Sequence, residues 1–150
     1  MIKVLFICHG NICRSPLAEF VFKDMVAKRG IADLFEIASA ATSMEELGND
    51  IHYGTRGVLM KYKIPFSRRR ARQITRLDYN EYDYLIGMDT ANIRNMNRTF
   101  GGDPEGKIYK LLTFAGSGRD VADPWYTGDF ETTYRDVCEG LEGFLEELGY

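Results

Sequence analysis

The chain has 150 residues, of which 45% are hydrophobic and 27% are charged, and its formal net charge is −3 at pH 7. This length and composition suit one globular domain over residues 1–150 with a sizeable core. The negative net charge argues against non-specific binding to nucleic acid. The apolar run Val4–Ile7 is too short for the hydrophobic region of a signal peptide or for a membrane span, so we expect no association with membranes.

The cysteines and histidines indicate a reducing compartment and no metal. Cys8, Cys13 and Cys138 are odd in number and form no disulfide framework, which is typical of a cytoplasmic protein. The two histidines, His9 and His52, lie far apart in sequence, and no Cys/His cluster has the spacing of a zinc site. We therefore expect a cytoplasmic protein without a metal.

Apolar runs and helical patterns alternate along the chain. We expect strands at Ile2–Ile7, Phe35–Ser39, Tyr82–Met88 and Lys107–Leu112. We expect helices from Pro16 to the residue before Gly30, over Thr55–Lys63, from Thr90 to about Phe100, and from Phe130 to Leu148. Strands that alternate with helices predict an α/β protein with a parallel sheet.

Three local details complete these expectations. Ser15 is expected to cap the first helix, with Pro16 at its first position. The helix over Thr55–Lys63 is expected to turn Tyr62 inward. The segment Thr113–Gly128 contains several glycines and reads as a long irregular loop, and such loops are often functional.

The segment Cys8-His-Gly-Asn-Ile-Cys-Arg-Ser15 joins the first strand to the first helix. A tight loop before a helix directs backbone N–H groups inward and makes an anion site. The guanidinium of Arg14 matches two oxygens of a phosphate group. The helix N-terminus and Arg14 favour a thiolate at Cys8, which indicates phosphoryl transfer through this cysteine.

Other residues around the loop support this interpretation. Gly10 lets the backbone approach a phosphate closely, and Asn11 tolerates left-handed geometry and can brace the loop through its amide. The hydroxyl of Ser15 can donate a hydrogen bond to the sulfur of Cys8. Ser39 and Asp89 are expected just past the ends of the second and third strands, where they share one rim with Cys8.

A proton source for the leaving oxygen is found in Asp123-Pro-Trp-Tyr126. Asp123 lies in the irregular segment, where one carboxyl can serve first as acid and then as base toward water. Trp125 and Tyr126 are expected to desolvate this carboxyl partly, which favours its protonated form, and to stack on an aromatic leaving group.

These motifs resemble the low-molecular-weight protein tyrosine phosphatase family in order along essentially the whole chain. The resemblance is carried by Val4–Glu19, Ser39–Ser43, Gly48-Asn49, Ile64-Pro65, Ala71–Gln73, Tyr84–Asp89, Asp123-Pro124 and Asp129–Thr132. It implies a four-stranded parallel sheet flanked by helices on both faces, an enzyme without metal or cofactor, and phosphotyrosine-containing protein substrates. It also implies that phosphate and vanadate inhibit at the loop. We expect a monomer.

The resemblance also implies roles for individual residues. Cys8 is the nucleophile, Arg14 the phosphate clamp and Asp123 the general acid. Ser15 tunes the thiolate, and Asn11 and Ser39 brace the loop. The remaining loop positions are His9, Gly10, Ile12 and Cys13, and Cys13 can form a reversible disulfide with Cys8.

Three positions depart from the family pattern. His9 follows the nucleophile where a smaller or apolar residue is frequent, Met44-Glu45 stands where many relatives carry an aromatic wall, and Trp125 replaces a tyrosine. We expect Glu45, Trp125 and Tyr126 to wall the substrate pocket. These departures bear on substrate preference, and the chemistry is expected to be the same.

Four rival functions remain. An arsenate reductase of this fold needs two further cysteines on a later segment, and none lies between Cys13 and Cys138. A protein-arginine phosphatase carries threonine where this chain has Ile12. A phosphocarrier domain needs no acid such as Asp123, and a non-catalytic phosphoprotein-binding module would not need both Cys8 and Asp123.

Some residues are expected to have structural roles only. The run Arg68–Arg70 is expected to be a solvated face, and the alternative is that it steers phosphorylated, acidic substrates. His52 is expected at the surface, and Cys13 and Cys138 are expected to pack in the loop and the core.

Overall fold

The computed structural model describes residues 1–150 and contains one sheet of four parallel strands. The strands are β1 (Ile2–Cys8), β2 (Phe35–Ala41), β3 (Tyr84–Gly87) and β4 (Ile108–Lys110), in the spatial order β2-β1-β3-β4. Cys8 lies opposite Ala41 of β2, and Ile7 lies opposite Gly87 of β3. The predicted four-stranded parallel sheet is therefore confirmed.

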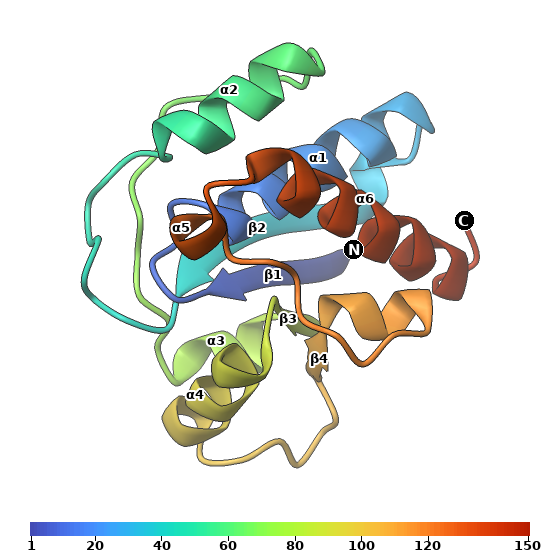
Figure 1. Ribbon diagram of the computed structural model, residues 1–150. Coiled ribbons are helices and arrows are strands. Elements are labelled where there is room, and N and C mark those ends of the chain that lie inside the picture. Colours follow the sequence, from blue (N-terminus) through green and yellow to red (C-terminus); the bar gives the residue numbers. More distant parts are fainter.

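Helices cover both faces of this sheet, as predicted (Figure 1). Val4 and Phe6 of β1 belong to the larger core, which packs under α1 (Arg14–Lys28) and α6 (Phe130–Glu147). Leu5 and Ile7 point the other way, into a smaller core under α3 (Leu77–Glu81) and α4 (Thr90–Phe100). Because successive side chains of a strand alternate, an apolar run such as β1 can feed both cores.

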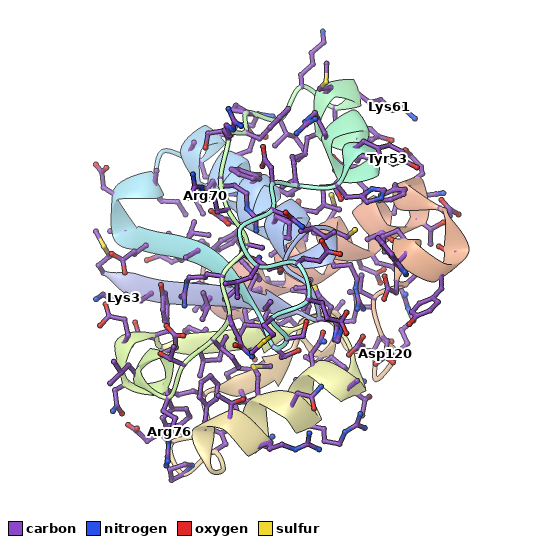
Figure 2. All side chains as sticks on the ribbon, turned by 90° about the vertical axis from the view of Figure 1, so that its left-hand side faces the viewer. Lys3, Tyr53, Lys61, Arg70, Arg76 and Asp120 are labelled. Atoms are coloured by element: carbon purple, nitrogen blue, oxygen red, sulfur yellow. The ribbon has the colours of Figure 1, made fainter.

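The order of the strands places a crevice at the end of β1. The chain crosses through α1 to β2 on one side of β1 and later returns to β3 on the other side. In doubly wound sheets ligands bind beyond the carboxyl ends of the strands at this reversal point. Figure 2 views the molecule from the side toward which β1 points in Figure 1, and both termini lie at the opposite end.

The remaining elements are short. They are η1 (Ala32–Leu34), α2 (Tyr53–Lys61), η2 (Leu111–Ala115) and α5 (Pro124–Thr127). Helix α5 lies inside the segment Thr113–Gly128, and η2 overlaps its start. This segment is therefore more regular than expected. No helix combines the length and the apolar character that crossing a membrane requires.

Several local expectations are wrong. Ser15 does not cap α1, because Cys13 occupies the N-cap position and the hydroxyl of Ser15 faces the sulfur of Cys8 instead. Tyr62 lies just after α2 at the surface, where its ring stacks on that of Tyr134 with 4.1 Å between centroids. Ser39 lies inside β2, since this strand continues to Ala41.

Candidate active site

The loop after β1 surrounds the sulfur of Cys8 with hydrogen-bond donors. The backbone N–H groups of Asn11 and Ser15 point at Sγ over 3.3 and 3.4 Å, and the Ser15 hydroxyl lies 3.0 Å away. Cys8 itself is only 3% exposed. Donors gathered around one buried sulfur stabilise a negative charge on it.

The side chain of Asn11 lies behind the loop and is tied to it by hydrogen bonds. Its φ is 59°, in the left-handed region, and its side chain is buried. The amide donates to Ser15 Oγ at 2.8 Å and to Ser39 Oγ at 2.9 Å, and Ser39 in turn donates to Glu19 at 2.6 Å. The chain of hydrogen bonds connects the loop to β2 and α1, so the donors around Cys8 are held in place before a ligand binds.

Arg14 is a buried cation that joins three segments. Its Nη2 lies 2.9 Å from Asp89 Oδ2 and 3.3 Å from Asp123 Oδ2, and its Nη1 donates to the carbonyl of Val121 at 3.0 Å. Burial acts to lower the pKa of Arg14, but the negative charges of Cys8, Asp123 and Asp89 outweigh it and leave the pKa above its usual value. The guanidinium is thus a permanent positive charge facing the loop.

The two carboxylates come from the ends of other elements. Asp89 lies just past β3, as predicted, and caps α4 by accepting the N–H of Asn92 at 2.8 Å in a capping box. Asp123 caps the short helix α5, where its Oδ1 accepts the N–H of Trp125 at 3.1 Å. Both carboxylates reach Arg14, so this cation and two acids from distant segments share one site.

The aromatic residues beside Asp123 are more exposed than expected. Trp125 is 61% and Tyr126 is 85% exposed, whereas the side chain of Asp123 is 27% exposed. Both rings are free to contact a ligand. Both rings line the pocket.

These residues enclose one pocket of about 520 Å³ at the carboxyl edge of the sheet. Its lining includes the predicted residues Cys8, His9, Gly10, Ile12, Cys13, Arg14, Glu45, Asp89, Asp123, Trp125 and Tyr126. It also includes Glu46, Ala91, Asn92 and Asn95, which no sequence pattern singles out. Asn11, Ser15 and Ser39 lie behind the lining and support it.

Comparisons with known proteins agree with this arrangement. The family model for low molecular weight phosphotyrosine protein phosphatase matches residues 3–149. This chain belongs to that family. It is 39% identical to the low molecular weight protein-tyrosine-phosphatase YfkJ of Bacillus subtilis, over 99% of this chain and 94% of the relative.

Solved structures of family members superpose closely. The crystal structure of YfkJ matches with a TM-score of 0.95 at 38% identity, covering 99% of this chain and 95% of that one. The low molecular weight protein tyrosine phosphatase SP-PTP of Streptococcus pyogenes matches with a TM-score of 0.89 at 44% identity, covering 99% and 93%. The Drosophila arginine phosphatase DARP matches with a TM-score of 0.88 at 27% identity, covering 99% of both chains.

Arg69 contacts the loop from outside the pocket, and no sequence motif indicates this contact. Its guanidinium donates to the carbonyl of Asn11 and, at 3.1 Å, to that of Asn49, so the expected solvated face at Arg68–Arg70 is wrong for this residue. Burial lowers the pKa of Arg69 from its usual value. A guanidinium on the carbonyl of Asn11 supports the left-handed residue on which the loop geometry depends.

His52 is half-buried and has more partners than the sequence indicates. It caps α2, with Nδ1 accepting the N–H of Gly54 at 3.0 Å, and its ring stacks on Phe130 with 5.2 Å between centroids. The His52 ring also lies edge-on to Trp125 at 5.9 Å. An imidazole that caps one helix and contacts a pocket wall is a structural support.

Two further pocket residues differ in their exposure. His9 Nε2 lies 2.9 Å from Glu45 Oε2, and both side chains are exposed at the rim. Cys13 is buried, and desolvation together with the negative charges of Cys8 and Asp123 raises its pKa to about 12. Cys13 is thus a neutral thiol at neutral pH.

Proposed function

We propose that this phosphatase hydrolyses phosphotyrosine in protein substrates, and small aryl phosphates, through a phosphocysteine on Cys8. The observation that carries the proposal is the meeting of three groups in one pocket. These are the hydrogen-bonded sulfur of Cys8, the permanent cation of Arg14, and the carboxyl of Asp123 at 3.3 Å from that cation. The relatives named protein-tyrosine-phosphatase support the substrate class.

In the first step, the thiolate of Cys8 attacks phosphorus in line with the phenolic oxygen. The S–P bond forms as the P–O bond to the phenol breaks, and Asp123 donates a proton to the departing oxygen. Loop N–H groups and the fork of Arg14 bind the three equatorial oxygens, where charge must be stabilised. In this proposal Arg14 exchanges part of its contact with Asp89 and Asp123 for the phosphoryl group.

In the second step, water attacks the phosphorus of the phosphocysteine. The carboxylate of Asp123 takes a proton from this water, the P–O bond forms and the S–P bond breaks. Inorganic phosphate leaves, and the thiolate of Cys8 is restored. We propose that phosphate and vanadate inhibit by occupying the same oxygen positions, and that Cys13 can trap an oxidised Cys8 as a disulfide.

Three considerations support the finer parts of the proposal. Arg14 and backbone amides supply the positive charge that phosphate needs, so the proposed reaction uses no metal or cofactor. The pocket of a single chain holds every proposed group, so the proposed reaction needs no second copy. A reactive thiol requires a reducing environment, which favours the cytoplasm.

A protein-arginine phosphatase is the alternative that one relative favours, since the Drosophila structure bears that name. Ile12 argues for the phenolic substrate, because it presents an apolar side chain to the pocket. Exposed Trp125 and Tyr126 offer faces on which a phenyl ring can stack.

The test compares phosphotyrosine and phosphoarginine at the same position of one peptide. We expect kcat/KM to favour phosphotyrosine, and we expect Cys8→Ser to abolish turnover while phosphate still binds. A preference for phosphoarginine would overturn the substrate assignment. An active Cys8→Ser variant would overturn the mechanism.

A further inference from the structure

The residue directly before Asp123 is held from both sides by α6. Thr133 Oγ1 donates a hydrogen bond to the carbonyl oxygen of Ala122 at 2.8 Å, and the N–H of Ala122 donates to Asp136 Oδ2 at 3.2 Å. Thr133 and Asp136 are both buried and lie three residues apart, on one face of the helix. Two side chains of a single helix thus satisfy both backbone polar groups of Ala122.

Asp136 is itself held in place. Its other oxygen, Oδ1, lies 2.9 Å from Nη1 of Arg119, whose Nη2 contacts Glu139 at 3.0 Å. Each carboxylate oxygen of Asp136 therefore has its own donor. A buried carboxylate with both oxygens satisfied makes a stiff support, because each alternative rotamer would leave a buried charge unpaired.

The residues before Ala122 are anchored as well. The N–H of Val121 donates to the carbonyl of Met88 at 2.9 Å, next to Asp89. Asp120 accepts the N–H of Thr90 at 3.1 Å and lies beside the start of α4 (Figure 2). The segment is thus tied to the end of β3 up to Val121, and the contacts from α6 continue this anchoring to Ala122.

On the other side of Asp123 the anchoring is local, because the N–H groups of Tyr126 and Thr127 return to the carbonyl of Asp123 within α5. Helix α5 has four residues, and Trp125 and Tyr126 on it are largely exposed. The Asp123 carboxyl contacts Arg14 at 3.3 Å and the N–H of Trp125 at 3.1 Å, and the backbone that precedes Asp123 sets the point from which it reaches them. A shift of about 1 Å in a catalytic group can cost about a hundredfold in rate.

We propose that Thr133 and Asp136 are positioning residues that place the carboxyl of Asp123 against the leaving oxygen. The inference rests on the proposed function, since it assigns its effect to the acid role of Asp123. The predicted defect falls on proton donation, because neither residue lines the pocket, and Val121, whose carbonyl binds Arg14, has its own anchor on Met88.

The test is the dependence of kcat/KM on the leaving group, with phenyl phosphate and dinitrophenyl phosphate as the two probes. A phenolate leaves only with a proton, whereas a dinitrophenolate leaves without one, so the ratio of the two kcat/KM values measures the acid. We expect Thr133→Val and Asp136→Leu to lower the phenyl-to-dinitrophenyl ratio by about tenfold. Thr133→Ser keeps the hydroxyl and is expected to keep the wild-type ratio.

Matched controls lie on the same helix. Thr132→Val removes a hydroxyl that contacts only Asp129, and Glu139→Gln removes the other carboxylate beside Arg119. Both are expected to keep the wild-type ratio. In an Asp123→Asn background, Thr133→Val is expected to cause no further change in the ratio, because its effect acts through the missing acid.

An equal loss on both probes, or an unchanged ratio in a folded variant, would overturn the inference and leave the proposed function standing. If either Thr133→Val or Asp136→Leu does not fold, the ratio measured for the other variant decides the test. A wild-type protein without aryl phosphatase activity would overturn the proposed function, and the inference with it.

Discussion

Cys8 and Cys13 show how local contacts give the same side chain two different uses. The sulfur of Cys8 faces the N–H groups of Asn11 and Ser15, whereas Cys13 packs in a small cluster with Ile12 and Ala71. Burial and nearby negative charge raise the pKa of Cys13 to about 12, so it is a thiol at neutral pH. Because the thiolate is the nucleophile, we expect Cys8 to be the reactive cysteine of the pair.

Alkylation under reducing conditions tests this difference. We expect iodoacetamide at about pH 8 to modify Cys8 first, to leave Cys13 unmodified, and to be slowed by added phosphate. Peptide mass spectrometry gives the rate at each position. Equal rates at Cys8 and Cys13, or no protection by phosphate, would contradict the assignment.

The sequence is informative about site residues that belong to a local pattern. Cys8 and Arg14 lie in one short loop and Asp123 in one tetrapeptide, so their residue types and spacing are sufficient to predict one pocket. Arg69 escapes prediction because its contact with Asn11 spans 58 residues and depends on a long side chain whose direction the sequence does not reveal. Ser15 resembles a helix cap by the local rule, but its contacts with Asn11 and Cys8 inside the loop outweigh that rule.

At the scale of elements, two glycines bring α6 close to η2, which lies on the path to the Asp123 loop. A Cβ at Gly143 would lie 2.3 Å from the carbonyl oxygen of Phe114, and one at Gly140 would lie 2.5 Å from a side-chain atom of Leu111. Backbone cannot move aside as a flexible side chain can. Gly143 therefore permits the close packing of these two elements.

The variant Gly143→Ala is expected to lower the free energy of unfolding by about 2 kcal/mol, since it forces two backbones apart. Gly57→Ala is the matched control, because Gly57 lies in α2 and a Cβ added there would meet no atom within 4 Å. For Gly57→Ala we expect the free energy of unfolding to rise by about 0.5–1 kcal/mol, because alanine has a higher helix propensity than glycine. Urea denaturation measures both, and a Gly143→Ala protein as stable as the wild type would contradict the packing argument.

The elements themselves are predicted well where their patterns are long. The strand at Ile2–Cys8 and the helices at Thr90–Phe100 and Phe130–Glu147 agree with the predicted ones to within about one residue. Helix α3 escapes prediction because it has five residues and begins at Leu77, which is largely exposed, so it shows no apolar period. The fourth strand is shorter than predicted because Leu111 and Leu112 are buried in a 3-10 helix.

At the scale of the whole molecule, the strand order assembles the site. The predicted parallel sheet is enough to expect Cys8 and Asp89 at one edge, because the carboxyl ends of parallel strands meet there. The sequence could not predict the spatial order of the strands. It also could not predict the contact of Arg14 with Asp123, because these residues lie 109 positions apart. The segment that carries Asp123 is anchored on α6 through Ala122.

The folded protein as a whole is expected to lose stability in alkali. Burial raises the pKa of Cys13 from 9.0 to about 12, and burial also raises the pKa values of Tyr134 and Cys138. Each group holds its proton more tightly in the folded chain. Its contribution to the free energy of unfolding is therefore complete below the pKa of the unfolded chain, and it is lost as the pH rises toward the pKa of the folded chain.

We expect the free energy of unfolding to fall by about 2 kcal/mol between about pH 8 and about pH 10.5 under reducing conditions. Cys13→Ala should flatten this decline, whatever its effect on stability at neutral pH. Urea denaturation across the pH range measures the slope. An equally steep decline in Cys13→Ala would show that this thiol is not a source of the pH dependence.

The central claim is that the phosphoryl group passes through the sulfur of Cys8. Rapid acid quenching during turnover of an aryl phosphate, followed by peptide mass spectrometry, tests it most directly. The expected result is one phosphoryl group on the peptide that contains Cys8, formed before inorganic phosphate appears and absent from Cys8→Ser. Phosphate release without this adduct, or an adduct on another residue such as His9, would contradict it.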